Sequence, residues 1–201
     1  SEQIICSDFL FYCKPSGKGG VTLHTASHNS ARDMAYIAMS TALISVCAWV
    51  SVPSAVPFTM QTFAVFLTAG VIGSRRALAA GSLYILLGAI GLPVFAGMQG
   101  GLGVLVGATG GYISGFLPAA FIAGLRHSGK RDGMVDIIMM ILGLLVCYTF
   151  GTLWYALGYL GGMEGIGAAL TACVLPYVIP DLLKILLAAV VARRLRAAVR
   201  L

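Results

Sequence analysis

The stretch VIPDLLKILLAAVVARRLR, residues 178–196, is apolar over most of its length and ends in a cluster of arginines. Apolar runs of similar length recur along the chain, and about 20 apolar residues in a helix cross the hydrocarbon core of a bilayer. The 201 residues are 59% hydrophobic and 10% charged, whereas soluble domains carry about 25% charged residues. We therefore predict an all-α integral membrane protein.

The apolar runs predict six transmembrane helices. Pro176 and Pro180 interrupt the last of them. Residues 1–30 hold an apolar run that is too short to span, and we expect a flexible cytoplasmic tail there, with the six-helix domain over residues 31–201. The expected spans are residues 32–51, 57–73, 76–95, a fourth that follows a glycine-rich stretch and ends near Leu125, 133–157 and 167–192.

The positive charges predict the orientation of this domain. Twelve of the thirteen Lys and Arg residues lie before the first span or after the second, fourth and sixth. Cytoplasmic loops of membrane proteins are rich in Lys and Arg, so both termini are expected to be cytoplasmic. The net charge of +6 then reflects topology, and no nucleic-acid partner is expected. The twelve residues are Lys14, Lys18, Arg32, Arg75, Arg76, Arg126, Lys130, Arg131, Arg193, Arg194, Arg196 and Arg200.

The thirteenth positive charge, Lys184, lies with Asp181 inside the apolar stretch. Lys184 precedes Arg193 by about 13 Å of helix, which puts it near the middle of the membrane. A charge there costs about 2.5–3.5 kcal/mol on insertion scales. Three compatible explanations are open: a structural i,i+3 ion pair, a helix that restarts at Pro180 with Asp181 in its first turn, and a cavity for a polar ligand.

A second polar cluster lies in the glycine-rich stretch Gly91–Tyr112, where Gln99 precedes Gly100 and Gly101. Glycine allows a backbone to approach a ligand closely, although an ordinary outer loop explains this composition equally well. Glycines at 107, 111 and 115 are a weak signal of helix packing.

The first expected span carries a face of small residues formed by Ala35, Ala38 and Ala42. Such a face permits close approach of another helix. From the spacing alone, packing inside the bundle is the simpler interpretation.

Other chemistry is not indicated. The five cysteines form no C-x-x-C pair, and we expect neither a metal site nor a cofactor. The chain has no G-x-x-x-x-G-K-[ST] motif, so it is not expected to hydrolyse ATP. H-E-x-x-H and G-x-S-x-G are absent as well. An intramembrane enzyme that uses Asp181 and Lys184 as acid and base is an alternative, and a helical scaffold without a ligand is another.

Three segments together resemble the biotin transporter (BioY) family, the substrate-binding S components of energy-coupling-factor vitamin transporters. They are VPFTMQTFAVFLTAGVIGSRRA (56–77), LLGAIGLPVFAGMQGGLGVLVGATGGYISGF (86–116) and PDLLKILLA (180–188). The resemblance implies a multi-pass protein of a prokaryotic plasma membrane with an outward-facing biotin site, capped by the loop after the first span. It also implies a transmembrane coupling subunit and two ATPases as partners. Transport of another small carboxylated vitamin is the nearest alternative, and the chain is not expected to be an enzyme.

The resemblance also implies roles for particular residues. Asp181 and Lys184 match the pair of the last helix that contacts biotin, and Gln99 falls where family members often carry a small amide residue. Gly100, Gly101 and Tyr112 complete the expected substrate site. Ala38 and Ala42 resemble the small-residue motif that docks S components onto the coupling subunit. The aromatic residues that could form apolar walls, although packing explains each more simply, are Tyr84, Tyr112, Tyr177 and Trp49.

Overall fold

The computed structural model describes residues 12–15, 21–24, 30–52, 57–125, 133–160 and 162–199. The chain divides into two compact units, Ser1–Ala35 and Tyr36–Leu201. The first unit contains an antiparallel pair of short strands, β1 (Tyr12–Pro15) and β2 (Val21–His24). The expected tail, residues 1–30, lies largely outside the described residues and stays a prediction.

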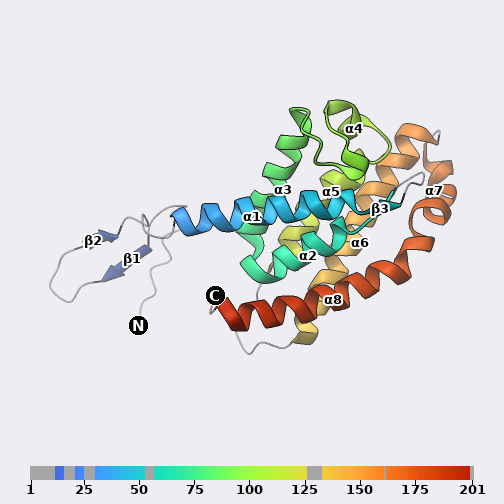
Figure 1. The fold of residues 1–201 in the computed structure, drawn as a ribbon. Coiled ribbons are helices and arrows are strands. Elements are labelled where there is room, and N and C mark those ends of the chain that lie inside the picture. The colour runs from blue at the N-terminus through green and yellow to red at the C-terminus, as the bar shows by residue number, and fades with distance from the viewer. Residues whose placement is uncertain are drawn as a thin grey trace. The chain divides into compact units, whose positions relative to one another are not determined.

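The described part of the chain is predominantly helical, as the sequence predicts (Figure 1). Two short strands, β3 (Ser51–Val52) and β4 (Phe58–Thr59), connect the first helix to the second. Two 3-10 turns lie at Ala96–Met98 and Met163–Gly165. The α-helices are α1 (Ser30–Trp49), α2 (Gln61–Ile72), α3 (Ser74–Ala89), α4 (Leu102–Val106), α5 (Gly110–Ala123), α6 (Gly133–Tyr159), α7 (Ile166–Cys173) and α8 (Leu175–Val199).

The outer faces of the long helices are apolar. By length and composition, two described helices could cross a membrane, Gly133–Tyr159 and Leu175–Ala197, and α2 and α5 are shorter apolar helices. Leu145 on α6 and Leu183 on α8 are 55% and 63% exposed, whereas Asp181 and Lys184 are buried. Charged groups inside and leucines outside are the arrangement that a lipid solvent favours. This supports a membrane protein, with α1, α2, α3, α5, α6 and α8 at the positions of the six expected spans.

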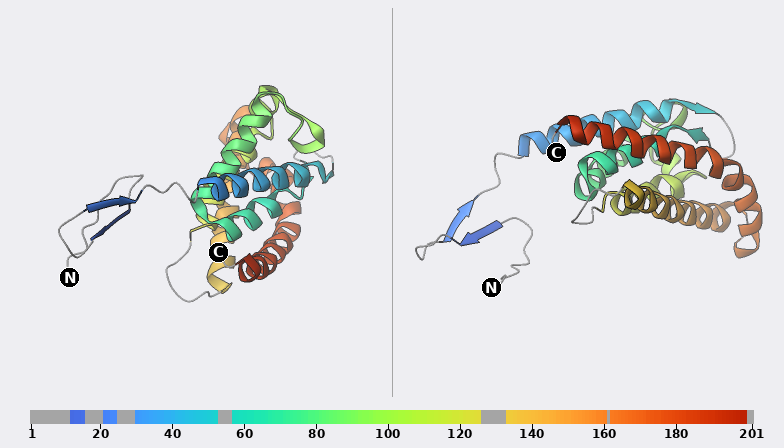
Figure 2. Two further views of the ribbon diagram at one scale, coloured as in Figure 1. Left: turned by 60° about the vertical axis from the view of Figure 1, so that its left-hand side comes forward. Right: turned by 90° about the horizontal axis from the view of Figure 1, so that it is seen from below.

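Helix α2 lies at the centre of one side of the bundle. It packs against α8, α5 and α3, and it lies between α1 and α8 in Figure 1 and in the left view of Figure 2. Nine of its twelve residues are buried, so α2 has little surface left for solvent or lipid. Its first two residues, Gln61 and Thr62, lie inside the bundle at the polar site described below.

Helices α5 and α6 pack most extensively, and glycines bring them together. A Cβ added at Gly111 would lie 2.2 Å from Trp154 Cβ, and one at Gly115 would lie 3.2 Å from Cys147 Cα. Gly111 and Gly115, two of the three glycines that gave a weak signal of helix packing in the sequence, therefore lie at a helix contact. Gly107 differs, because it follows α4 and its carbonyl accepts a hydrogen bond from Trp154 Nε1 at 3.0 Å.

The glycine-rich stretch between α3 and α5 folds into tight turns. Gly91, Gly97 and Gly101 have positive φ angles of 109°, 67° and 97°, a region that residues with a Cβ rarely adopt. The amide of Phe95 donates to the carbonyl of Gln99 at 2.9 Å. The glycines thus allow this outer connection to turn back and present Gln99.

The last expected span is divided, although not where the sequence suggested. The break falls at Val174, between α7 and α8, and α8 continues through Pro180. Pro176 lies in the first turn of α8, where an N–H has no partner within the helix, and Pro180 deprives only one carbonyl of a partner. The prediction that a helix restarts at Pro180, with Asp181 in its first turn, is therefore wrong.

The ends of α6 and α8 are joined by an ion pair between Asp136 and Arg196. Arg196 is 6% exposed, and its Nε also donates to the carbonyl of Ala192 at 3.3 Å. This arginine is therefore part of the packed interior, unlike the exposed Arg193 and Arg194 beside it.

Helix α5 should tolerate no side chain at Gly111. We expect Gly111→Val to lower the free energy of unfolding by about 1–3 kcal/mol or more, because overpacking forces the two helices apart. Thermal unfolding in detergent measures the effect. Gly158→Val on α6 is the matched control, since a Cβ there meets nothing within 4 Å. Equal losses in the two variants would contradict this account of the α5–α6 contact.

Candidate ligand-binding site

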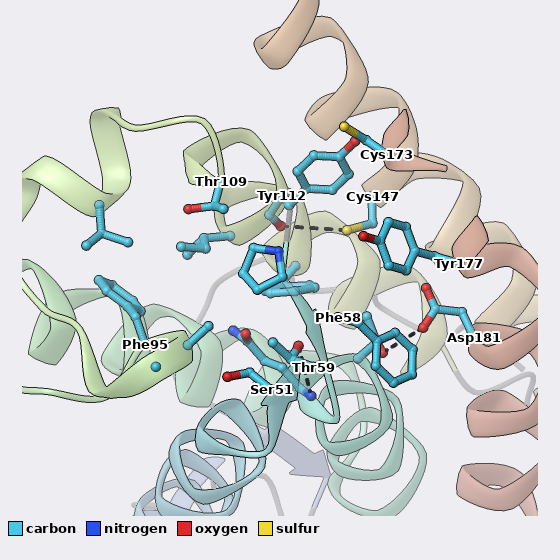
Figure 3. Close-up of a pocket in the computed structure, with 18 of the residues that line it drawn as sticks. Ser51, Phe58, Thr59, Phe95, Thr109, Tyr112, Cys147, Cys173, Tyr177 and Asp181 are labelled. Carbon is cyan, nitrogen blue, oxygen red and sulfur yellow. Dashed lines mark hydrogen bonds between the residues drawn. The ribbon is translucent and has the colours of Figure 1, made fainter. Parts of the chain in front are cut away.

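A cavity of about 360 Å³ lies inside the second unit (Figure 3). Its walls come from β3 and β4, the start of α2, the glycine-rich stretch, α5, α6, and the α7–α8 segment. This volume is within the range of pockets that hold small molecules, about 300–1,000 Å³. Residues that flank the loop after α1, Ser51 and Pro57, line the cavity. The loop itself, residues 53–56, lies outside the described residues, so its expected role as a cap stays a prediction.

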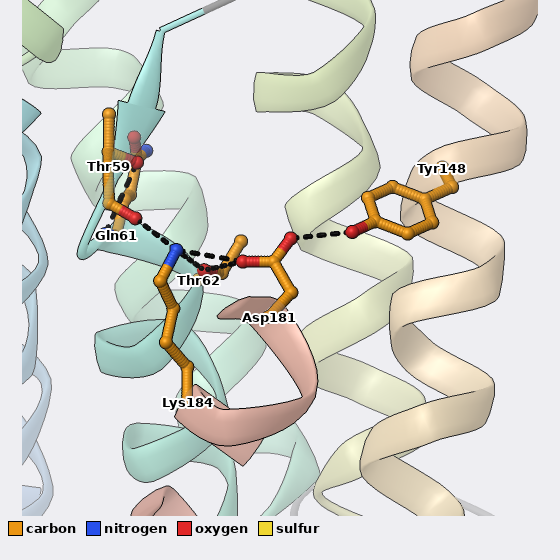
Figure 4. Close-up of polar contacts among 6 residues, drawn as sticks. All are labelled: Thr59, Gln61, Thr62, Tyr148, Asp181 and Lys184. Atoms are coloured by element: carbon orange, nitrogen blue, oxygen red, sulfur yellow. Dashed lines mark hydrogen bonds and ion pairs between the residues drawn. The ribbon is translucent and has the colours of Figure 1, made fainter. Parts of the chain in front are cut away.

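Asp181 and Lys184 form an ion pair in the cavity wall (Figure 4). Lys184 Nζ lies 2.8 Å from Asp181 Oδ1, and the two residues are 5% and 6% exposed. The structural ion pair is therefore confirmed, and the pair also lines a cavity; that the cavity takes a polar ligand stays a prediction.

Lys184 is held by three acceptors. Besides Asp181, its Nζ donates to the carbonyl of Thr59 at 2.6 Å and to Thr62 Oγ1 at 3.2 Å. The Phe58 ring lies 3.7 Å from Nζ and adds a cation–π contact. An ammonium has three donors, so a ligand acceptor would have to replace one of these bonds, most easily the longer one to Thr62.

Asp181 retains capacity for one more donor. Tyr148 donates to Oδ2 at 2.7 Å, while Lys184 and Thr62 occupy Oδ1, the latter at 3.2 Å. A carboxylate offers about four lone-pair sites, and three are used by described residues. The remaining site is on Oδ2, and the residue lines the cavity. Asp181 can thus accept an N–H from a bound molecule while it remains paired with Lys184.

Of the other four predicted site residues, two line the cavity and two do not. Gln99 and Tyr112 line the cavity, in the glycine-rich stretch and on α5. Gly100 and Gly101 are not among the described lining residues. Gly100 packs against the Leu92 carbonyl, where a Cβ would come within 2.3 Å, and the Gly101 amide donates to the Gly88 carbonyl at 2.7 Å. These two glycines shape the loop that carries Gln99, and their contact with a ligand stays a prediction.

Of the four aromatic residues that could form apolar walls, two line the cavity and two do not. Tyr112 and Tyr177 line the cavity, and Tyr177 stacks on Phe58 with ring centroids 6.1 Å apart. Tyr84 is 1% exposed and lies in the core, and Trp49 donates to the carbonyl of Pro93 at 2.8 Å. Neither of the last two is among the described residues that line the cavity.

Sequence reasoning did not identify Phe58, Thr59, Thr62 and Tyr148 as site residues. Thr59 and Thr62 lie in the segment PFTMQTF, which contributed only to the family resemblance. The signal that could have found Tyr148 is its hydroxyl in the middle of the long apolar run of α6. Its partner, Asp181, is 33 residues away in the chain, and only the packing of α6 against α8 brings the two together.

The described residues contain no group of three or more His, Cys, Asp or Glu side chains arranged to hold a metal ion. The polar groups of the cavity are one ion pair, amides and hydroxyls, surrounded by aromatic rings. Such a lining suits a small organic molecule with a hydrogen-bonding head and an apolar body.

A helical bundle with apolar outer faces and an internal cavity around a buried ion pair defines the class: a membrane protein with a site for a small polar molecule. The model of the BioY family matches residues 21–201, and the chain belongs to this family.

Relatives of known name agree with this assignment. The biotin transporter BioY of Thermotoga maritima is 43% identical over 157 residues, which cover 78% of this chain and 90% of the relative. The probable biotin transporter BioY of Pyrococcus horikoshii is 39% identical over 167 residues, 83% of this chain and 97% of the relative.

One similar crystal structure is that of the S-component for biotin from an ECF-type ABC transporter. It has a TM-score of 0.75 and 23% sequence identity, and the match covers 86% of this chain and 95% of that one. The two proteins share their fold.

The ion pair predicts a characteristic pattern of stability. Lys184→Met leaves Asp181 buried without its cation, and breaking a buried pair costs about 3–5 kcal/mol. The double variant Asp181→Asn/Lys184→Met removes both charges and keeps an acceptor for Tyr148. We expect it to unfold in detergent at a higher temperature than Lys184→Met alone. A double variant that is less stable than Lys184→Met would show that the loss in Lys184→Met does not come from an unpaired buried charge on Asp181.

Proposed function

We propose that this chain binds biotin with high affinity and mediates its uptake as the S component of an energy-coupling-factor transporter. The observation that carries the proposal is the Asp181–Lys184 pair in the wall of a cavity, in a chain of the BioY family. The relatives compared above are named as a biotin transporter and a probable biotin transporter, and they match this chain over most of their length.

The chemistry of the cavity suits biotin. The ligand has a ureido ring with two N–H donors and a carbonyl, an apolar thioether ring and a carboxylate on a flexible chain. Asp181 can accept a ureido N–H at the unused site of Oδ2, and a charged acceptor strengthens that bond. Lys184 balances the charge and can donate to an acceptor oxygen. Phe58, Phe95 and Tyr177 line the cavity and offer apolar walls for the ring and the chain.

Gln99 and Tyr112 belong to the proposed site as further lining residues. Gly100 and Gly101 are proposed to act beside them, by bringing backbone close to the ligand. No cofactor is needed for this role, because the ligand is held by hydrogen bonds and apolar contact alone. We also propose that the chain is not an enzyme, since the three donors of Lys184 already bond to described acceptors, which suits a structural and ligand-binding role for this group.

The proposed topology has six transmembrane helices, α1, α2, α3, α5, α6 and α8, with both termini in the cytoplasm. The distribution of Lys and Arg along the sequence supports it. The protein would then be a multi-pass protein of a prokaryotic plasma membrane, with residues 1–30 as a cytoplasmic tail and 31–201 as the substrate-binding domain. Lipid would cover the exposed leucines of α6 and α8.

The proposed partners are a transmembrane coupling subunit and two ATPases, because the chain carries no P-loop of its own. Ala38 and Ala42 are exposed on α1, beside the exposed Met34 and Met39. Packing inside the bundle, the simpler interpretation of their spacing, is therefore wrong for this part of α1. A surface of small residues that no described helix covers supports docking of another helix there.

Biotin binding tests the proposal directly. Titration calorimetry of the purified protein in detergent should show saturable binding at one site. Asp181→Asn should weaken that binding at least about tenfold, because a neutral amide replaces a charge-assisted acceptor. Glu164→Gln is the matched control, since this exposed acid lies outside the lining. Absence of biotin binding by the wild-type chain would refute the function, and an unchanged Asp181→Asn affinity would refute the role of Asp181.

Docking is tested separately. Ala38→Trp should abolish co-purification with a co-expressed coupling subunit while biotin binding stays unchanged, because the bulky ring blocks close approach of a helix. Ala168→Trp, on an exposed position of α7, is the control and should co-purify normally. Normal co-purification of Ala38→Trp would place the docking surface elsewhere.

A further inference from the structure

Gln61 is a buried amide in the cavity wall that neither the sequence analysis nor the proposed function uses. It is the first residue of α2, it is 4% exposed, and it lines the cavity. It lies next to the polar network of the ion pair (Figure 4). The backbone N–H of Gln61 donates to Thr59 Oγ1 at 3.3 Å, and the carbonyl of Thr59 accepts from Lys184.

The Gln61 side chain is held by a hydrogen bond to Tyr84, a residue of the core that does not line the cavity. Gln61 Nε2 donates to the Tyr84 hydroxyl at 2.9 Å. Tyr84 is 1% exposed, and its ring meets Phe95 edge to face, with centroids 5.4 Å apart and an interplanar angle of 79°. Phe95 in turn fills the space over Gly88, where a Cβ would come within 2.0 Å of its ring. Tyr84 is therefore closely packed, and its hydroxyl restrains the position of the Gln61 amide.

The amide of Gln61 keeps unused hydrogen-bonding capacity. Among the described residues, the bond to Tyr84 is the only one that its side chain makes. A side-chain amide has two N–H donors and a carbonyl acceptor. One N–H is taken, which leaves the other N–H and the carbonyl oxygen. Gln61 lines the cavity, so a molecule bound there can meet these two groups.

The edge of an amide and the edge of a urea are complementary. A cyclic urea presents a carbonyl oxygen beside an N–H, and an amide can meet that edge with an N–H and a carbonyl in two parallel bonds. The second N–H of the urea faces the opposite way and needs its own acceptor. Asp181, in the same cavity wall, has one acceptor site left for it.

We propose that Gln61 recognises one edge of the ureido ring of biotin through two hydrogen bonds, that Asp181 accepts the other ureido N–H, and that Tyr84 is the positioning residue for Gln61. This inference rests on the proposed function. It assigns the hydrogen-bonding head of the ligand to the start of α2 and the middle of α8. The apolar ring and chain then extend along the aromatic walls.

The first test compares biotin affinities by titration calorimetry for the wild type, Gln61→Met, Tyr84→Phe and the double variant. Gln61→Met should lose about tenfold or more, because two bonds to the ligand disappear. Tyr84→Phe removes one hydroxyl and should lose several-fold. The double variant should bind no more weakly than Gln61→Met, because Tyr84 acts through Gln61. Additive losses would overturn the positioning role, and an unchanged Gln61→Met affinity would overturn the recognition role.

The second test varies the ligand. Biotinol has an alcohol in place of the carboxylate, and 2-iminobiotin has an imine in place of the ureido carbonyl. The loss caused by Gln61→Met should be the same for biotin and biotinol. It should be smaller for 2-iminobiotin, since an N–H there opposes the N–H of Gln61. A loss that vanishes for biotinol would mean that Gln61 contacts the carboxylate end, and the proposal would fail.

Controls separate the outcomes from misfolding and from failure of the proposed function. Tyr159→Phe removes an exposed hydroxyl that bonds to the carbonyl of Val106 outside the cavity lining, and its affinity should not change. If Gln61→Met unfolds, Gln61→Asn keeps the amide but shortens its reach, and it should show the same loss with the same ligand dependence. If the wild type does not bind biotin, the proposed function itself fails; if it binds and the Gln61 variants bind equally well, only this inference fails.

Discussion

The ion pair between Asp181 and Lys184 organises the interior of this protein. A charge in the middle of an apolar bundle is expensive, so every group within reach is used to satisfy it. Lys184 connects α8 to the backbone of β4 and to the first turn of α2, and Asp181 connects α8 to Tyr148 on α6. The pair thereby joins β4, α2, α6 and α8, four of the segments that form the cavity.

Close packing elsewhere makes room for this arrangement. Glycines bring α5 and α6 into backbone contact, which leaves the remaining volume on the side where α2, α6 and α8 converge. The glycine-rich stretch folds over α3 and places Phe95 and Gln99 at the cavity. Small residues at helix contacts and a polar interior under an apolar surface are two consequences of folding in lipid, where burial of apolar groups adds little to helix association.

The sequence identified the residues that are conspicuous against an apolar background. Asp181 and Lys184 stand out because charges are rare in such a run, and Gln99 stands out because it interrupts a run of glycines. Tyr148 in the middle of the apolar run of α6 and Gln61 at the start of α2 are weaker signals, because a hydroxyl or an amide alone does not tell which group it meets. Their roles depend on partners that are 33 and 23 residues away in the chain, and no local pattern carries that information.

Composition and charge distribution determined that the chain is helical, apolar on its outside and built from long hydrophobic segments, because these properties follow from solvation of each segment by itself. Tertiary structure alone decided that the last segment breaks at Val174 rather than at Pro180, and that the face of Ala38 is exposed. It also decided which hydroxyls and amides meet the buried charges. These outcomes depend on how several helices share one interior, because groups such as Tyr148, Asp181 and Lys184 find their partners only through that packing.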